Sequence, residues 1–399
     1  MVSGMYHIAC SGLHATSTHI QSHQSHQFPM KLIFVILFAI LPVLAYSQTT
    51  VETYSNGSKK AEGKLVNAQR EGIWYEFNLK GLKVAEGSYV NGVKEGRYTS
   101  WHLNGKKQFE GYFKYGKLNS KVTSWRIDGT IEESGHITND LRDSTWVFYH
   151  PDGTVGSTGA FRDGKMEGKW TYVYENGEKW KEGSFAADDR TGIWKYWYMD
   201  GHIHHTGEYI ANKENGVWKG WFTNGQVKDS GWYDNGKMKG QWKGWFENDR
   251  QQYINYYVEG NLDSTYKVWY PNGKPRTDGK YIKGIKDGQW KEWYDNGQMS
   301  EAGSWLGGER HGYWVYFDAE GFKIKEENFD KGKPDGAWKA YYANGRLSGS
   351  GQYVNKIKEG TWQYWGQDGK LMLKSEFSNG QKIKEKRYGQ AGKELEPGR

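Results

Sequence analysis

Cysteine, proline and aliphatic residues are scarce in this sequence, and each scarcity excludes a class of structure. The 399 residues include one Cys and seven Pro, whereas Gly numbers 54, Trp 21 and Tyr 29. A single cysteine excludes an intramolecular disulfide framework. Because so few aliphatic side chains accompany the rings, the buried surface has to be built largely from aromatic residues. This composition predicts thin layers stacked in series rather than a conventional aliphatic core.

A strong excess of one charge sign is also missing. The chain has 54 Lys and Arg against 47 Asp and Glu, a formal net charge of +7, and the two signs are interleaved. No basic stripe emerges, so the sequence does not indicate nucleic-acid binding. Residues 384–399 are interpreted as a basic, polar C-terminal tail.

One long apolar run is present, near the start of the chain. Residues 30–48 read MKLIFVILFAILPVLAYSQ, with one Lys, an apolar stretch and then small residues around position 46. This is the tripartite pattern of a secretory signal peptide, which predicts residues 30–47 as the signal and cleavage after Ser47. The run is shorter than the roughly 20 apolar residues of a spanning helix. We therefore expect an exported protein, periplasmic or on the outside of the cell, with no transmembrane anchor after cleavage.

The 29 residues before this run contain no Lys, Arg, Asp or Glu. We interpret residues 1–29 as an upstream extension or a disordered segment, with Met30 as the true initiator. Five of the twelve histidines and Cys10 then lie outside the mature protein. The His-rich tract is accordingly not predicted to bind a metal.

An internal repeat organises the rest of the sequence. A Gly-x-aromatic step recurs at intervals that are multiples of 24 residues, and Ser120, Ser144 and Ser264 occupy the places where Gly is missing. A second Gly column, usually preceded by Asn or Asp, keeps the same period. Asn-Gly and Asp-Gly are strong hairpin signals, and aromatic residues favour strands. Each unit is predicted to be a strand, a tight Asn-Gly turn, a second strand and a looser loop.

The predicted fold is all-β. About 13 tandem 24-residue antiparallel β-hairpins, over residues 48–383, are expected to form one twisted meander sheet. Two strands per unit at about 4.8 Å each give roughly 120 Å for an open sheet. Which face is packed stays open, since Trp290 and Trp293 lie three places apart and should point to opposite faces. Either a bulge intervenes or both faces carry rings.

The unit resembles the MORN repeat in its bacterial MORN-2 variant, found in proteins often labelled as toxin–antitoxin antitoxin components. The resemblance rests on blocks such as residues 288–297 (GQWKEWYDNG), followed by Gly303, Trp305 and Gly308. It implies an elongated β-hairpin array that acts as a scaffold for protein or membrane association. In MORN proteins that are enzymes, the activity belongs to a fused domain, and no stretch here is long enough for one. The antitoxin label fits poorly with a signal peptide.

The sequence offers few residues for chemistry. His202, His204 and His205 form the densest histidine cluster outside residues 1–29, but they occupy ordinary strand positions near a turn. The Asp-Asn-Gly runs at 234–236 and 295–297 lack the further acidic ligands of a calcium loop and fit hairpin turns. No catalytic constellation is present. We expect no metal, no cofactor and no enzymatic activity.

Rows of rings are the candidate interaction surface. The favoured hypothesis is a non-enzymatic exported scaffold that binds a protein or an envelope component along its sheet. The alternative is a carbohydrate or cell-wall binding array, because exposed rings can stack sugars or cage quaternary ammonium groups. Against this alternative stands the interpretation that the rings are simply the core, which we favour because a chain this poor in aliphatic residues needs rings to fill its interior. The units that use Ser in place of Gly could mark a bend or a partner surface, or be simple drift. The candidate surface residues are Trp197, Trp221, Trp245, Trp269 and Trp293.

Overall fold

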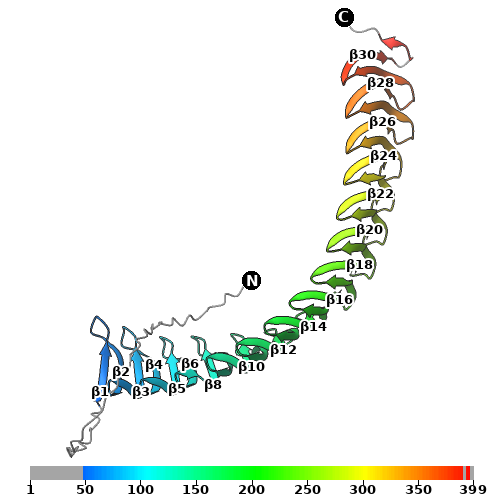
Figure 1. Cartoon of the computed structure of the whole chain (residues 1–399). Coiled ribbons are helices and arrows are strands. Elements are labelled where there is room, and N and C mark those ends of the chain that lie inside the picture. The colour runs from blue at the N-terminus through cyan, green and yellow to red at the C-terminus, as the bar shows by residue number, and fades with distance from the viewer. Residues whose placement is uncertain (1–47, 390–391, 396–399) are drawn as a thin grey trace, which may run out of the picture. The chain divides into compact units, whose positions relative to one another are not determined.

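The computed structural model describes residues 48–389 and 392–395 as β-strands joined by turns. The predicted signal peptide at 30–47 and the segment before it lie outside the described residues. Within the described residues, no helix has the length and the apolar composition needed to cross a membrane. The strands follow one another in chain order (Figure 1).

The first half of the sheet holds fifteen strands. Their bounds are β1 Gln48–Thr53, β2 Lys59–Val66, β3 Gln69–Phe77, β4 Lys83–Val90, β5 Val93–Trp101, β6 Lys107–Lys114, β7 Lys117–Leu118, β8 Ser120–Trp125, β9 Ile131–Thr138, β10 Leu141–Tyr149, β11 Val155–Arg162, β12 Lys165–Val173, β13 Lys179–Ala186, β14 Asp189–Trp197 and β15 Ile203–Ile210.

The second half continues with sixteen more. Their bounds are β16 Lys213–Trp221, β17 Val227–Asp234, β18 Lys237–Trp245, β19 Gln251–Val258, β20 Asn261–Trp269, β21 Pro275–Ile282, β22 Ile285–Trp293, β23 Met299–Leu306, β24 Glu309–Phe317, β25 Lys323–Asp330, β26 Lys333–Tyr341, β27 Leu347–Val354, β28 Ile357–Trp365, β29 Leu371–Ser378, β30 Gln381–Tyr388 and β31 Glu394–Leu395.

These strands form one antiparallel meander, as predicted. A typical strand, β14, pairs with β13 before it and with β15 after it. The same pattern runs through the 31 strands of the sheet, with one interruption. The short β7 and the following β8 are two parts of one strand, and both pair with β6. The prediction of an all-β meander built from tandem hairpins is confirmed.

The two turns of each unit are the reverse of the prediction. The tight turn has two residues, such as Ala187 and Asp188 between β13 and β14, both with positive φ (51° and 77°). The second Gly column, usually preceded by Asn or Asp, lies in the longer loop instead. In the loop after β14, the Gly201 N–H donates to the Tyr198 carbonyl at 3.0 Å, and the equivalent bonds in other loops are 2.8 to 3.0 Å long. Gly201 takes φ 84°, a conformation that glycine adopts without steric cost.

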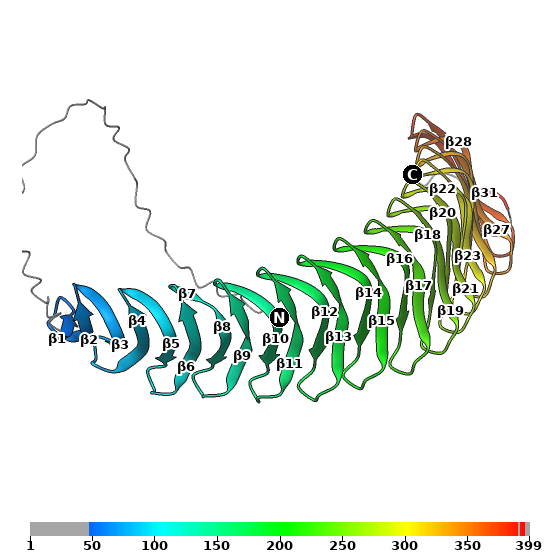
Figure 2. The same cartoon turned by 60° about the horizontal axis from the view of Figure 1, so that its bottom comes forward.

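A bulge accompanies the first Gly column. In the β13–β14 pair, Glu182 lies opposite Lys195 and Ser184 opposite Thr191, so the register shifts around Gly192, which has φ 64°. A bulge bends its strand and increases the local twist. The strands are accordingly bowed (Figure 2).

Two of the three serine-containing units keep this geometry. Ser144 and Ser264 take φ 58° and 57°, the conformation of the Gly that they replace. The preceding Asp stabilises each: the Ser144 N–H donates to the Asp143 carboxylate, and the Ser264 hydroxyl donates to Asp263. The unit of Ser120 is different, because the strand breaks between β7 and β8 at Asn119. Only this unit departs from the regular pattern of the three.

Hydrogen bonds from turn side chains tie each unit to the next. A Tyr hydroxyl at the start of a loop donates to the backbone carbonyl 23 residues later, as Tyr174 does to Trp197 at 3.0 Å. The equivalent donors are Tyr54, Tyr198, Tyr270, Tyr294 and Tyr342. Turn asparagines such as Asn176 reach the next turn in the same way, to the Met199 carbonyl. These hydrogen bonds recur because the 24-residue period places equivalent positions of successive units next to each other.

The sheet extends past the predicted end of the array. β30 runs to Tyr388, five residues into the segment 384–399 that the sequence predicted as a tail. Its edge pairs with the two-residue β31 through Arg387 and Tyr388. The high Lys content of this segment masked its strand character, since charged side chains are usual on an edge strand.

Candidate interaction surface

One face of the sheet is packed with aromatic rings and the other is more open, and strand β14 has side chains on both. Trp194 and Tyr196 lie on one face, here called the packed face, where their rings are 6.1 Å apart. Lys195 and Trp197 lie on the other, here called the open face. The bulge that displaces register at the end of this strand pair falls on β15, where His204 is the extra residue, so β14 keeps its alternation. The second alternative is therefore correct: both faces carry rings, and the bulge lies on the partner strand rather than between the two Trp residues.

On the packed face, the first Trp column is the core. Trp194 is 1% exposed and lies edge-to-face between Phe185 and Tyr209, at 5.1 and 6.1 Å between ring centroids. Its indole N–H donates to the Ser184 carbonyl at 3.2 Å. The ring covers Gly183, where an added Cβ would lie 2.2 Å from it. Such edge-to-face contacts continue from ring to ring through the core clusters of this face.

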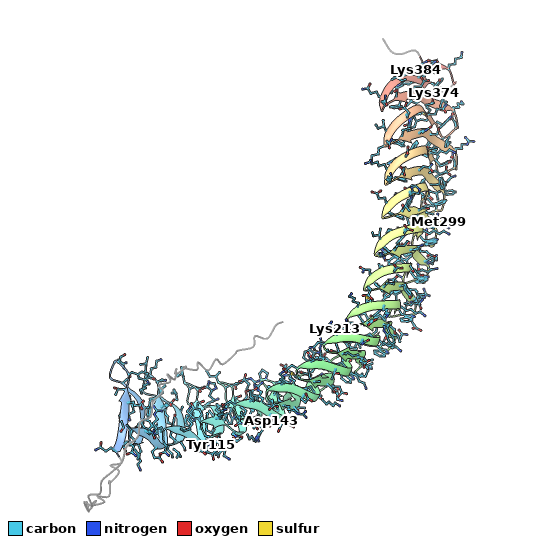
Figure 3. The ribbon with its side chains drawn as sticks, viewed as in Figure 1. Tyr115, Asp143, Lys213, Met299, Lys374 and Lys384 are labelled. Atoms are coloured by element: carbon cyan, nitrogen blue, oxygen red, sulfur yellow. The ribbon has the colours of Figure 1, made fainter. Side chains whose placement is uncertain are left out.

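On the open face, the structure brings the five candidate residues into one row. Trp197, Trp221, Trp245, Trp269 and Trp293 end every second strand from β14 to β22, and all are half-buried. Successive rings are two strands apart, about 9.6 Å. Side chains project from both sides of the ribbon (Figure 3). The row is therefore a periodic surface that the core does not absorb.

The ends of this row differ in charge. The Lys179 ammonium lies 5.4 Å from the Trp197 ring, and that of Lys219 lies 5.3 Å from Trp221. Among the described residues, no Lys or Arg lies over Trp245, Trp269 or Trp293. The later three rings therefore keep their faces free of the chain's own cations.

The packed face carries cations in register with its Trp column. The residue four places before the Trp lies over the ring at 4.1–4.4 Å: these pairs are Arg70 with Trp74, Arg142 with Trp146, Lys286 with Trp290, Arg310 with Trp314 and Lys358 with Trp362. Two of the arginines also bind a carboxylate nine residues earlier, Glu133 for Arg142 and Glu301 for Arg310. Sequence reasoning missed this cation column, although its 24-residue spacing could have revealed it.

A cavity of about 280 Å³ interrupts the packed face at β15 to β18. Gly220 and Gly244 stand in the column that elsewhere holds Tyr172, Tyr196 or Tyr316, so a ring is missing. Asp229 lies between these two glycines, opposite both in register. Its carboxylate leans over Gly220, where an added Cβ would meet Oδ1 at 2.8 Å.

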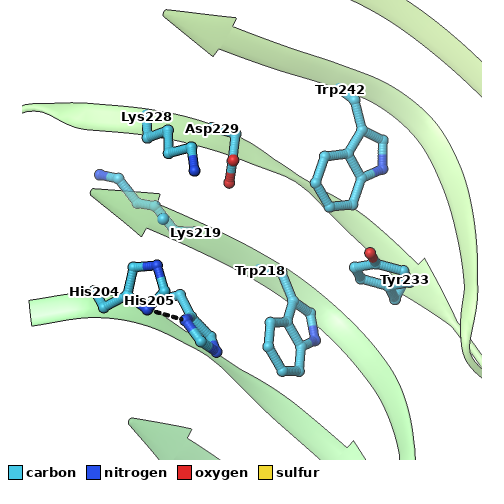
Figure 4. Close-up of a pocket in the computed structure, with 9 residues that line it drawn as sticks. His204, His205, Trp218, Lys219, Lys228, Asp229, Tyr233 and Trp242 are labelled. Carbon is cyan, nitrogen blue, oxygen red and sulfur yellow. Dashed lines mark hydrogen bonds between the residues drawn. The ribbon is translucent and has the colours of Figure 1, made fainter. Parts of the chain in front are cut away.

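Asp229 lines this pocket together with aromatic side chains and two lysines (Figure 4). The walls are formed by His204, His205, Trp218, Tyr233 and Trp242, with Lys219 and Lys228 at the rim. The His205 ring stacks on Tyr196 at 4.0 Å, and its Nδ1 lies 3.1 Å from Nδ1 of His204. Burial lowers the pKa of His205 to about 4 and also lowers the pKa of His204, so both are neutral at pH 7. Burial raises the pKa of Asp229.

The other sequence candidates occupy turns. His202 does not line the pocket, and its Nδ1 lies 3.3 Å from the Asp200 carboxylate. No group of three or more His, Cys, Asp or Glu in the described part of the chain could hold a metal ion. The run at 295–297 forms a loop in which the Gly297 N–H donates to the Tyr294 carbonyl at 2.9 Å. The run at 234–236 similarly ends β17, and Asn235 takes φ 51°.

The 24-residue hairpin unit, with its Gly bulge and buried Trp, is now defined in structure as well as in sequence. Six of its copies match the MORN repeat variant. The matched segments are residues 94–115, 166–187, 262–283, 286–305, 334–355 and 358–379. Each begins in the second strand of a hairpin and ends near the following two-residue turn, so the match follows the structural unit. No curated protein matches the chain.

Among solved structures, the chain aligns with pieces of large toxin complexes. The crystal structure of TcdB2-TccC3-Cdc42 has 10% identity and a TM-score of 0.14, with 86% of this chain and 23% of that chain covered. The crystal structure of TcdB2-TccC3 has 12% identity and a TM-score of 0.17, with 86% and 18% covered. This chain thus spans about a fifth of the length of those chains. TM-scores this low do not establish a shared fold.

Proposed function

We propose that this chain is a non-catalytic scaffold that binds a protein or an envelope component on the open face of its sheet. The observation that carries the proposal is the row Trp197, Trp221, Trp245, Trp269 and Trp293, which lies half-buried on the face that the core leaves uncovered. Large aromatic residues dominate the energetics of protein interfaces because they bury much area with little loss of side-chain freedom. The similarity of six units to the MORN repeat variant supports a role in binding rather than in chemistry.

The charged groups also suit a scaffold. Many carboxylates lie in ion pairs on the sheet, such as Glu182 with Lys179 at 3.0 Å and Glu86 with Lys83 at 3.0 Å. A carboxylate held by a neighbouring ammonium is a poor general base, because its pKa stays low. The pKa of Glu182 is indeed lowered by its lysine partners, against the opposing effect of burial. This supports a binding surface without an active site.

Export is part of the same proposal. The pattern of a charged start, an apolar run and small residues at 30–47 supports secretion, and β1 begins at Gln48, directly after it. We propose a periplasmic or outer-surface location. Fractionation of cells that express the chain, with and without residues 30–47, tests this: export requires that the deletion leave the protein in the cytoplasm.

A pull-down with matched variants tests the scaffold. The immobilised chain captures a specific protein from envelope extracts, and replacing Trp245, Trp269 and Trp293 with alanine abolishes capture. A control variant replaces three exposed apolar residues outside the row, Leu103, Tyr115 and Ile127, with alanine and retains capture. If both variants capture equally, or if nothing is captured above background, the open face is not a protein-binding surface.

A second function is favoured by the free faces of Trp245, Trp269 and Trp293. Rings about 9.6 Å apart in a row, without a cation over them, could stack successive sugars of an extended glycan. Titration with cell-wall and plant oligosaccharides, followed by Trp fluorescence, separates this function from the first. Quenching that saturates in the parent chain and disappears with Trp269→Ala favours the glycan. A flat titration rejects it.

A further inference from the structure

The pocket around Asp229 has a counterpart elsewhere in the same chain, and the counterpart is filled. In the unit of Trp314, the Arg310 guanidinium donates to both carboxylate oxygens of Glu301, at 3.1 and 3.2 Å. It also donates to the Tyr316 hydroxyl at 2.6 Å and lies 4.1 Å from the Trp314 ring. Carboxylate, ring and guanidinium thus form one site, in which one guanidinium nitrogen, Nη2, donates to both carboxylate oxygens and the group also makes a cation–π contact.

At the pocket, the equivalent repeat positions hold a carboxylate and a Trp ring but no cationic side chain. Residues 72 positions earlier, which is three repeats, are Asp229 for Glu301, Met238 for Arg310 and Trp242 for Trp314. The unit of Arg142 shows the filled arrangement again, with Glu133 at 2.7 Å and Trp146 at 4.4 Å. Met238 therefore replaces the one member that neutralises the carboxylate.

The neighbouring unit does not supply the missing charge. The cation position before Trp218 holds Glu214, and no Lys or Arg of the described residues lies over Trp218 or Trp242. No ion pair within 4.0 Å involves Asp229 in the described part of the chain. A half-buried carboxylate without a partner is costly, because burial disfavours its charged form. Gly220 lines the open pocket, whereas the Tyr253 ring covers Gly244, where an added Cβ would lie 2.0 Å from it, so the space for a visiting group lies on the Gly220 side of Asp229.

The titratable side chains near Asp229 do not neutralise its charge, so a ligand with a positive charge fits the pocket best. His204 and His205 carry no positive charge at pH 7. Lys219 points its ammonium toward Trp221. Lys228 is exposed and lies on the same strand as Asp229 (Figure 4), where it lowers the pKa of that carboxyl only as a secondary effect after burial. Among the described residues that line the pocket, Lys228 and Lys219 are the groups whose charge opposes an incoming cation.

We propose that the Asp229 pocket receives the guanidinium group of an arginine side chain on a bound protein. The guest reproduces in trans what Arg310 does in cis: it pairs with the Asp229 carboxylate and lies against Trp218 and Trp242. Guanidinium suits this site better than ammonium because its planar fork matches a carboxylate and stacks on rings. The pocket lies on the packed face, so the proposal rests on the scaffold function but goes beyond it by adding a second contact on the face opposite the Trp row.

Ethylguanidinium is the probe for this site, and ethylurea is its neutral counterpart of the same shape. Binding to the full chain is measured by calorimetry at constant ionic strength and by the NMR signal of the Met238 methyl group, which packs in the cluster of Trp218 and Trp242. Ethylguanidinium shifts this signal saturably, with a dissociation constant on the order of a millimolar. Ethylurea does not.

Four variants decide whether Asp229 is responsible. Asp229→Asn weakens binding at least about tenfold, the effect of losing one charge-assisted contact. Met238→Arg abolishes binding, because the chain then supplies its own cation. Lys228→Ser strengthens binding. The matched control Glu301→Gln, in a unit whose cation site is already filled, leaves binding unchanged. No saturable response, equal responses to ethylurea, or unchanged binding in Asp229→Asn overturns the proposal.

The two proposals fail separately. A chain that binds ethylguanidinium through Asp229 but captures no protein keeps the pocket and contradicts the scaffold. A chain that captures a protein partner equally well with and without Asp229→Asn, and gives no response to ethylguanidinium, keeps the scaffold and contradicts the pocket.

Discussion

At the scale of single residues, the same residue type has two meanings in this chain. A Trp on the packed face is surrounded by rings and by the glycine that it covers, whereas a Trp three places later lies half-buried on the open face. Removing a buried side chain costs its transfer free energy and leaves a cavity. Substitutions of the two kinds of Trp should therefore differ strongly in stability.

Trp194→Ala is expected to reduce the free energy of unfolding by about 3 to 5 kcal/mol, as for other buried large aromatic residues. Trp269→Ala, on the open face, is expected to cost less than about 2 kcal/mol because part of that ring already contacts water. Urea titrations followed by circular dichroism measure both. Equal losses for the two variants would contradict the assignment of the faces.

Acid should destabilise the region around His205. This imidazole titrates near 6.5 when exposed and near 4 in the folded chain, where burial and the charges of His204 and Lys228 disfavour its protonation. Between these pH values the unfolded chain binds more protons, so stability falls as the pH drops from 6.5 toward 4. Asp229, whose pKa is raised, opposes this loss at the acid end of the window.

Comparing the parent chain with His205→Gln separates the contribution of the His205 imidazole from the titration of the carboxylates. The variant should lose less stability than the parent between pH 7.5 and pH 4.5, measured by denaturant titration at each pH. A loss of the same size in both chains would show that His205 titrates normally.

At the scale of the hairpin, glycine matters for two separate reasons. Gly192 takes φ 64° in a bulge, and the serines that replace it in other units adopt nearly the same angle. Gly183 has an ordinary φ but lies under the Trp194 ring, so space rather than backbone conformation demands glycine there. The two columns should tolerate substitution differently.

Gly192→Ser is expected to cost about 1 kcal/mol, since the left-handed conformation is mildly strained for a residue with a Cβ. Gly183→Ala is expected to cost about 3 kcal/mol or more, because its Cβ would lie 2.2 Å from the ring of Trp194 and would displace it. Thermal melts of the two variants rank these costs. The reverse ranking would contradict the packing of Trp194 on Gly183.

At the scale of the whole sheet, every unit contacts mainly its neighbours in sequence. Stability is then close to a sum of units and of the interfaces between them. The inter-unit hydrogen bonds, such as Tyr174 to Trp197, connect residues 23 apart and need only the period of the repeat. Lengthening or shortening the array by whole units should therefore leave it folded.

Deletion of residues 261–284, one whole period comprising β20 and β21, is expected to keep a folded sheet. The residues from Ile285 onward then occupy the repeat positions of those from Asn261 onward. Deletion of residues 261–272, half a period, places turn residues in strand positions and disrupts pairing. Circular dichroism and resistance to proteolysis compare the two. A half-period deletion as stable as the full one would contradict the register.

The sequence by itself determined the strands, the period and the all-β meander. These follow from local preferences and from the 24-residue spacing of Gly, Asn-Gly and aromatic columns, which any pairing of neighbouring hairpins must respect. The reversal of the two turns escaped it because both turns of many units contain a glycine with positive φ, as Gly225 in the longer loop and Gly236 in the two-residue turn, so the glycine signal does not tell the two turns apart. The end of β30 escaped it because its many lysines are typical of a solvated tail.

Only the tertiary structure decided which rings are buried and which charges are paired. The packing of Trp194 depends on Gly183 of one neighbouring strand and on Tyr209 of another, and the missing partner of Asp229 is visible only beside Glu301 and Arg310. These contacts join residues on adjacent strands, and bulges set which side chains meet there. A side chain's column in the repeat fixes its neighbours, but the space and the charge around it depend on what those neighbours are.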